Sequence, residues 1–287
     1  MELIHGYRND KNLRDSFNAL AEQTFDGLNF EGWYQNGFWG DNYDPHSIVI
    51  DGQVVSNVSV NRTDLLMGGN RYRILQLGTV MTDPAYRGRG LGRAIMDYIE
   101  KEYADVDGIY LFGNDGVVDY YPKFGFRPGR EYVYSKNVSM TGECKARQVL
   151  MDGAESWAKL SAAMAKSTFR EGCKMVDNPE LIFFYVSQFM QEAVYHIPHL
   201  DAWVVAEPEE GSLTIHNIFA GAGVTIDDVA AAFGAEVKEI VLGFSPESPD
   251  GWKLEEIHEE DTHFFVKGAV FNEFEGKKLR IPGLSHA

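Results

Sequence analysis

Cysteine is scarce in this sequence, and so is positive charge. The two cysteines among 287 residues, Cys144 and Cys173, are too few for a disulfide framework, and no group of cysteines and histidines has zinc-site spacing. We therefore expect no metal. Lysine and arginine number 26 against 43 acidic residues, which gives a net charge of −17. Nucleic acid and anionic membranes bind basic faces, so we expect neither as a partner.

Long apolar runs are also missing. No stretch approaches the ~18 apolar residues that a membrane-spanning helix requires. The start of the chain, Met1–His5, has no basic segment followed by an apolar run, so we expect no signal peptide and a cytoplasmic protein. The length is sufficient for two domains of ordinary size. The acidic composition favours solubility, and an acidic surface would also attract a cationic amine.

One stretch combines an apolar strand, a glycine-rich turn and a helix. Residues 75–81 have the composition of a strand, which Asp83-Pro84 ends because proline cannot donate to the ladder. Gly88, Gly90 and Gly92 follow within five residues. Leu91 is then followed by apolar residues every four positions, at Ile95, Ile99 and Tyr103. This spacing predicts a helix with one buried face.

A helix start of this kind can hold a pyrophosphate. Its first backbone N–H groups are unpaired and carry partial positive charge, and glycines leave them accessible. Arg87, Arg89 and Arg93 add full charges. The run lacks the Walker A pattern, and its glycines alternate instead of following the dinucleotide fingerprint. The alternative interpretation is a tight turn whose arginines face water.

A second motif follows about twenty residues later and identifies a family resemblance. After the predicted strand at residues 108–112 come Asn114 and the run Asp119-Tyr-Tyr-Pro-Lys-Phe-Gly-Phe126. Together with Arg87-x-x-Gly90-x-Gly92, this pattern resembles the acyl-CoA site of the GNAT N-acetyltransferases. The match covers about residues 45–135. The chain departs from the usual pattern at Val117 and Pro122, neither of which removes a functional group.

The resemblance implies that acetyl-CoA is the cosubstrate and assigns roles to particular residues. Backbone groups of Val80, Met81 and Thr82 would pair with the pantetheine arm, and Asn114 would contact it. The pyrophosphate would lie on Arg87, Gly88, Arg89, Gly90, Leu91, Gly92 and Arg93. Tyr121 would donate a proton to the departing sulfur, and Tyr120 would pack inward. The general base stays open between Glu31, Asp41, Asp44, Gln76 acting through water, and the terminal carboxylate of Ala287.

The expected fold is a mixed α/β sheet of the GNAT type over residues 1–140, followed by a degenerate GNAT-like domain over 141–287. The first sheet should hold strands near 47–50, 54–60, 71–81, 109–112 and 132–138, with a helix opening near Gly116. The second half should hold helices over 157–169, from Pro179 and over 225–233. Its strands should lie near 202–206, 213–219, 237–244, 253–257 and 263–270. Asp227 and Asp228 at its helix start would compete with phosphate, so we expect one CoA site.

Three functions fit these features. The first is acetyl transfer to a primary amine of the small cationic kind. The second is protein-lysine or N-terminal acetylation, and the third is an acyl-CoA-binding sensor or scaffold without catalysis. An aromatic cluster between Phe30 and Tyr43 either walls an ammonium pocket or packs over the sheet. The chain is expected to be a monomer or a homodimer.

Overall fold

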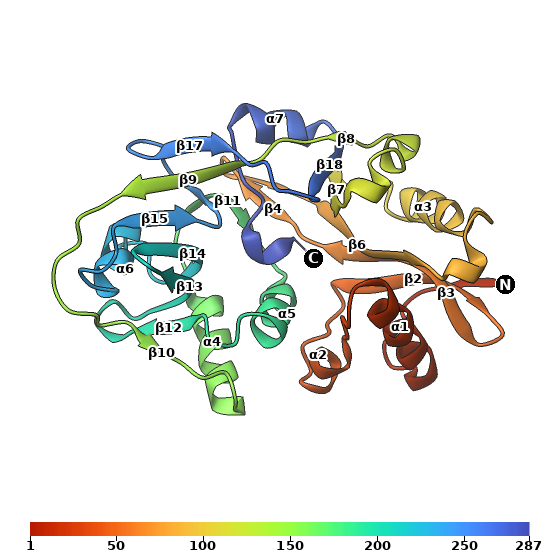
Figure 1. The fold of residues 1–287 in the computed structure, drawn as a ribbon, viewed down its shortest axis with the longest axis horizontal. Helices are drawn as coiled ribbons and strands as arrows, with labels where there is room; N and C mark the ends of the chain where they lie inside the picture. Colours follow the sequence, from red (N-terminus) through yellow and green to blue (C-terminus); the bar gives the residue numbers. More distant parts are fainter. Residues whose placement is uncertain (287) are drawn as a thin grey trace.

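The computed structural model describes residues 1–286, and its first sheet has seven strands in the order β1-β2-β3-β6-β7-β18-β8. The pair β6 and β7 is parallel and the neighbouring strands are antiparallel. Helix α3, Leu91–Glu102, connects β6 to β7 and covers one face (Figure 1). The strand bounds are β1 Glu2–Ile4, β2 Tyr43–Ile50, β3 Gln53–Arg62, β6 Ile74–Thr82, β7 Gly108–Gly113, β8 Arg127–Pro128 and β18 His263–Lys267.

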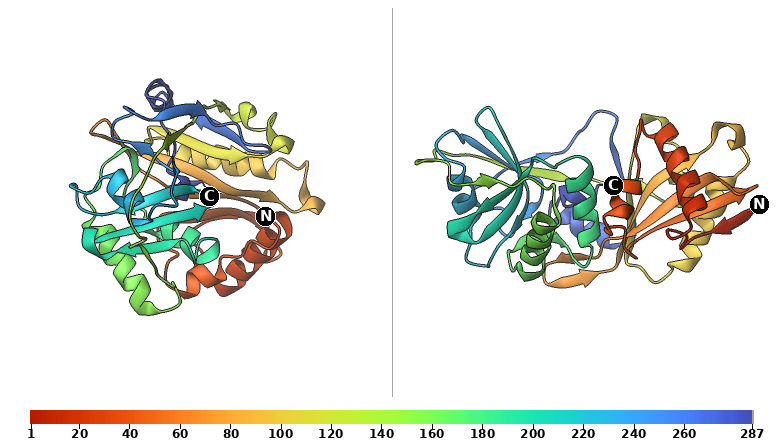
Figure 2. Two further views of the ribbon diagram at one scale, coloured as in Figure 1. Left: turned by 60° about the vertical axis from the view of Figure 1, so that its left-hand side comes forward. Right: turned by 90° about the horizontal axis from the view of Figure 1, so that it is seen from below.

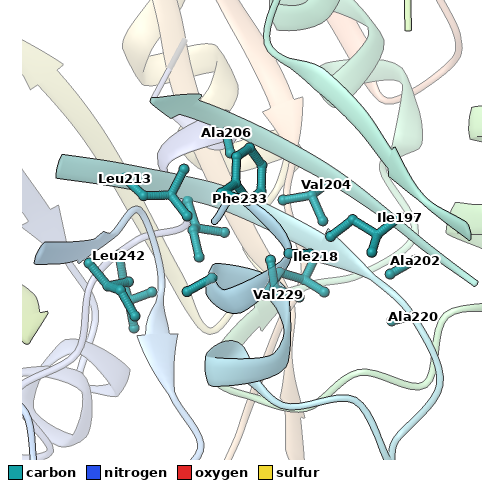
Figure 3. Packing of buried hydrophobic residues seen from close by; sticks show 14 of the residues in the cluster. Ile197, Ala202, Val204, Ala206, Leu213, Ile218, Ala220, Val229, Phe233 and Leu242 are labelled. Atoms are coloured by element: carbon teal, nitrogen blue, oxygen red, sulfur yellow. The ribbon is translucent and has the colours of Figure 1, made fainter. Parts of the chain in front are cut away.

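A second seven-stranded sheet repeats this plan in the order β10-β12-β13-β14-β15-β9-β17. Its parallel pair is β14 and β15, and a short helix, α6 (Ile226–Ala232), connects them as α3 connects β6 to β7. The strand bounds are β9 Tyr132–Asn137, β10 Arg147–Gln148, β12 Val194–Ile197, β13 Ala202–Glu209, β14 Ser212–Phe219, β15 Glu239–Leu242 and β17 Lys253–Glu256. Figure 3 shows Val204, Ile218 and Val229 in the buried core of this second unit.

The two sheets exchange one strand each. Strand β9 follows the first sheet in the chain but pairs with β15 of the second, and β18 returns from the second half to pair with β7 of the first. In both sheets the exchanged strand lies antiparallel to the second member of the parallel pair. We expected residues 132–138 to close the first sheet, and this was wrong because local pattern does not specify a pairing partner. The division at residues 140 and 141 stays a prediction for the sequence units, but neither sheet is confined to one side of it.

A third, four-stranded sheet joins the halves, in the order β16-β11-β4-β5. The hairpin β4 (Leu65–Met67) and β5 (Asn70–Tyr72) comes from the first half, and β11 (Glu171–Met175) and β16 (Ser245–Pro246) come from the second. Strands β4 and β11 are hydrogen-bonded along Leu65–Met67. The two halves therefore share a continuous backbone ladder, and they lie side by side in the right-hand view of Figure 2.

The remaining helices begin where capping residues predict. Asp10 accepts from the first amides of α1 (Lys11–Thr24), and Asn178 accepts from Leu181 in α5, with Pro179 in its first turn. Thr225 and Asp228 form the predicted capping box of α6. The other helices are α2 Glu31–Gln35, α4 Ala154–Lys166 and α7 Val270–Gly276. No helix in residues 1–286 is both long and apolar enough to cross a membrane.

Several expected elements differ from the structure. The helix expected near Gly116 is replaced by two 3-10 turns, Asp115–Val117 and Tyr121–Phe124, because the Asn114 side chain caps the first and the left-handed Gly125 ends the second. Helix α4 ends at Lys166, short of the predicted residue 169. The last strand stops at Lys267, and α7, which the pattern did not reveal, follows.

Candidate active site

The parallel pair at the centre of the first sheet separates part of the way along. Strand β7 pairs with β6 only from Ile74 to Gln76, whereas β6 continues to Thr82. Over Leu77–Thr82, β6 is paired with β3 on one side only. The other edge presents strand backbone without a partner strand, to which an extended ligand can add by main-chain hydrogen bonds.

A β-bulge lies on this open edge. Between Ser59↔Gly78 and Asn57↔Met81, β6 has one residue more than β3. Thr79 occupies the left-handed region at φ 47°, which is strained for a β-branched residue. Tyr43 Oη lies 2.6 Å from Thr79 Oγ1, and Asn57 Nδ2 donates to the Thr79 carbonyl at 2.8 Å. Since the peptide is trans, the Val80 N–H points away from Asn57 and is not held by it.

The glycine-rich turn leads from the end of β6 into α3. Gly88 and Gly90 both have φ 75°, and Gly90 is the N-cap of α3 with no side chain to accept from its first amides. A Cβ at Gly88 or Gly90 would meet no atom within 4 Å. The main chain therefore faces open space here, and the amides at the start of a twelve-residue helix are not occupied by a side-chain cap.

Three arginines surround this turn without carboxylate partners. Arg87 Nε donates to the Thr82 carbonyl at 3.1 Å, and an Arg89 Nη atom donates to the Ala85 carbonyl at 3.0 Å. The Arg93 guanidinium lies 4.9 Å from the centre of a phenylalanine ring. Among residues 1–286 no carboxylate lies within 4 Å of these three guanidinium groups. In a chain of net charge −17, three cations without carboxylate partners beside a helix N-terminus are the combination of groups that favours an anion.

The tyrosine pair lies beside the same turn. Tyr121 is 3% exposed, and burial raises the pKa of its phenol, so the group keeps its proton near neutral pH. Its ring lies against the end of β7, where a Cβ at Gly113 would come within 2.9 Å of Tyr121 Cε2. Tyr120 is only partly buried, and its hydroxyl would lie 2.6 Å from a Cβ at Gly92 in the first turn of α3. The structure thus brings Tyr120 to the glycine turn, whereas Tyr121 is the more buried of the two and packs in the core of the first sheet.

Asn114 follows β7 and is exposed. Its Oδ1 accepts from the Gly116 amide at 3.1 Å, which leaves its Nδ2 group for another partner. The expected contact with a pantetheine arm stays a prediction.

The aromatic cluster packs as core. Phe30, Trp33, Trp39 and Tyr43 are each at most 5% exposed and stack with one another beneath the sheet, which is the packing interpretation of this segment. No ammonium ligand can reach their faces without opening this core.

The candidate general bases already have partners. Arg14 Nε donates to Glu31 at 2.7 Å, Arg8 pairs with Asp41 at 2.6 Å, and the Gly6 amide donates to Asp44 at 2.7 Å. Gln76 is buried in the sheet and accepts from Asn61 Nδ2 at 3.1 Å. Ala287 lies outside the described residues. The base therefore stays open between these groups.

The sequence did not reveal that the C-terminal segment lies against the separated strands. The Tyr110 hydroxyl of β7 donates to the Ser285 carbonyl at 2.8 Å, and the His286 ring stacks on Phe112 with centroids 4.1 Å apart. Burial lowers the pKa of His286 to about 3, so its imidazole is neutral. The C-terminal end of the chain lies between the two sheets in Figure 1. The apolar Ile281 and Leu284, both buried, are a local signal for this docking.

Comparison with known proteins agrees with this geometry. Residues 11–129 match the model of the acetyltransferase (GNAT) domain family. A conserved protein of Enterococcus faecalis V583, described as a probable N-acyltransferase, has a similar structure (TM-score 0.60, 14% identity, 95% of this chain and 74% of that one). A GCN5-related N-acetyltransferase from Kribbella flavida is also similar (TM-score 0.54, 18% identity, 93% and 72%), as is Eis1 from Mycobacterium abscessus (0.55, 12%, 92% and 73%). These likenesses extend through both sheets and show a GNAT fold.

Proposed function

We propose that the protein, whose residues 11–129 match the acetyltransferase (GNAT) domain family, transfers the acetyl group of acetyl-CoA to a small cationic primary amine. The observation that carries the proposal is the glycine turn, where uncapped helix amides and three unpaired arginines meet the open edge of β6. The net charge of −17 supports a cationic acceptor, because an acidic surface raises the local concentration of amines.

In this proposal different groups of the chain bind different parts of acetyl-CoA. Backbone amides from Arg87 to Gly92, with the arginine side chains, hold the diphosphate. Val80, Met81 and Thr82 offer the unpaired edge of β6 to the amide groups of the pantetheine arm, and Asn114 contacts it from the end of β7. The Thr79 bulge turns the Val80 N–H away from Asn57, which makes that amide a donor for the thioester carbonyl.

The transfer needs two proton movements. The free amine attacks the thioester carbon, the new C–N bond forms, the C–S bond breaks, and the amine loses a proton to a base. The departing thiolate accepts a proton from the Tyr121 hydroxyl, which burial keeps protonated. The tyrosine is then reprotonated from solvent.

Titration calorimetry with acetyl-CoA tests whether the glycine turn and its arginines bind the diphosphate. We expect the double variant Arg87→Asp/Gly90→Asp to bind at least about 100-fold more weakly, because charge-assisted hydrogen bonds contribute about 1.5–3 kcal/mol each. Arg147→Asp reverses one arginine charge, as Arg87→Asp does, but on exposed β10 of the second sheet, and should leave affinity unchanged. Undiminished binding by the double variant would refute the assignment of the diphosphate to this turn.

A thiol-release screen against aminoglycosides, polyamines, amino acids and peptides tests the acceptor. Turnover with small polyamines and none with peptides is the expected result. Preferred peptide turnover would indicate a protein acetyltransferase. Tight acetyl-CoA binding without turnover on any amine would favour the sensor or scaffold.

A further inference from the structure

A groove between the two halves lies away from the glycine turn. It has a volume of about 770 Å³ and runs between α4, the start of α5, β11 and the β4–β5 hairpin. Its larger apolar lining residues include Leu66, Met164, Phe169, Met175, Ile182 and Phe219. This volume is within the range of sites for small organic molecules, which are mainly apolar with a few polar groups.

One carboxyl group in this groove has no hydrogen-bond partner. The Glu171 side chain as a whole is partly exposed, but its Oε1 is shielded from solvent and receives no hydrogen bond. Lys174, three residues along, donates instead to the Phe169 carbonyl at 3.2 Å, and no cation among residues 1–286 lies within 4 Å of Glu171. A buried acceptor without a donor is costly, so this oxygen is an attachment point for a ligand that brings a donor.

The groove is distant from the acetyl-transfer site. The β4–β5 hairpin that borders it enters β6 at Ile74, whereas the thioester is proposed to lie at the Val80 amide of the same strand. Six residue steps of a strand span about 20 Å at ~3.3 Å each. A molecule in the groove is therefore not positioned to receive the acetyl group.

We propose that this groove binds a small organic ammonium ion, with its apolar body on the Met164, Met175 and Ile182 side chains and its N–H group donating to Glu171 Oε1. The apolar walls favour hydrocarbon, and the unpartnered carboxyl oxygen accepts the charge-assisted hydrogen bond that an ammonium supplies. Because the walls come from both halves, the ligand contacts the β4–β5 hairpin and α4 at once.

The other charged groups at the groove do not compete for this role. Arg170 pairs with Glu247 at 3.2 Å, and Arg71 pairs with Asp177 at 2.6 Å. The Lys174 ammonium would repel a positively charged ligand. It also lowers the pKa of Glu171, but by less than burial raises it.

Burial raises the pKa of Glu171 to about 7. A bound cation favours the ionised carboxylate, so affinity should increase as pH rises from 6 to 8 while the amine stays protonated.

Calorimetry with 2-phenylethylammonium tests the proposal, with 2-phenylethanol as the uncharged probe. We expect the ammonium to bind the full chain and to bind Glu171→Gln about tenfold more weakly, the change that one charge-assisted hydrogen bond of ~1.5 kcal/mol predicts. Glu247→Gln removes a carboxylate from the same groove that already has a partner, and should retain affinity. Ala165→Trp adds bulk to the α4 wall without changing charge, and should abolish binding.

Other results would overturn the assignment. Equal affinity for the ammonium and the alcohol would refute the proposed hydrogen bond to Glu171. Absence of ammonium binding would refute the proposed site. Binding retained in both Glu171→Gln and Ala165→Trp would place the amine elsewhere, including at the acetyl-transfer site. Circular dichroism and thermal unfolding of each variant exclude misfolding as the cause of a loss.

Discussion

The exchange of β9 and β18 predicts that the first half cannot fold alone. A fragment of residues 1–140 lacks β18, whose Phe264, Phe265 and Val266 are 8%, 2% and 0% exposed in the whole chain. Burying three side chains of this kind contributes about 5–9 kcal/mol, at ~1.5–3 kcal/mol each. A domain has a net stability of only about 5–15 kcal/mol, so the loss is comparable with the total. Strand β8 also loses its partner in the first sheet.

Urea unfolding followed by tryptophan fluorescence measures this effect, with Trp33 and Trp39 as the probes in the fragment and all five tryptophans as the probes in the whole chain. Residues 1–140 should show no cooperative transition, whereas the whole chain should show one. Joining residues 1–140 to residues 258–287 through a flexible linker restores β18 and α7, and should recover part of the transition. A fragment 1–140 that unfolds cooperatively at the midpoint of the whole chain would refute the reasoning.

Point variants of the whole chain separate β18 from the other deleted elements. Phe265→Ala should lower the unfolding free energy by about 3–5 kcal/mol, the cost of removing a buried aromatic ring. Lys253→Ala on the exposed part of β17 should change it by less than about 0.5 kcal/mol. Equal effects of the two would contradict the role given to β18.

Three further predictions concern single groups. Tyr121→Phe should lower kcat by about 100-fold, a typical contribution of a general acid, with acetyl-CoA affinity nearly unchanged; unaltered turnover would move the donor elsewhere. Gly92→Ala should weaken acetyl-CoA binding because its Cβ meets the Tyr120 hydroxyl, and adding Tyr120→Phe should restore it; failure of this rescue would remove the steric explanation. Burial raises the pKa of Glu131 to about 8, far above its unfolded value, so the unfolded chain binds fewer protons and stability should fall as pH rises from about 4 to 8. Unfolding by urea at several pH values should show a shallower fall for Glu131→Gln, and an identical slope would contradict this.

The elements that sequence predicts best are those with local causes. The turn from β6 to α3 was identifiable because proline, glycines and spacing-four apolar residues act on their own neighbours. The same holds for the Asn178 and Thr225 caps, which are satisfied within three residues. The β2–β3 hairpin at Asp51-Gly52 is equally local, and its turn has the left-handed conformations that this pair favours.

The parts that sequence did not reveal depend on distant partners. Residues 132–137 have the same strand composition whichever sheet they join, so their pairing with β15 could not be read from them. The Thr79 bulge depends on Tyr43 and Asn57, which lie on other strands. The environment of Glu171 depends on the Lys174 ammonium donating to the Phe169 carbonyl instead of to the carboxyl group, which no spacing along the sequence expresses.

The shared ladder between β4 and β11 limits how the two halves of this protein can move apart. Hinged proteins open by swinging one lobe from another, but here such a swing would break main-chain hydrogen bonds and expose the apolar residues beneath them. Movements of loops and side chains leave this ladder intact, so they cost less free energy than separation of the two halves. If the halves stay joined, a proposed acceptor too bulky to enter past the loops and side chains is excluded, because no wider, opened conformation forms. The fold itself then limits the size of the acceptor.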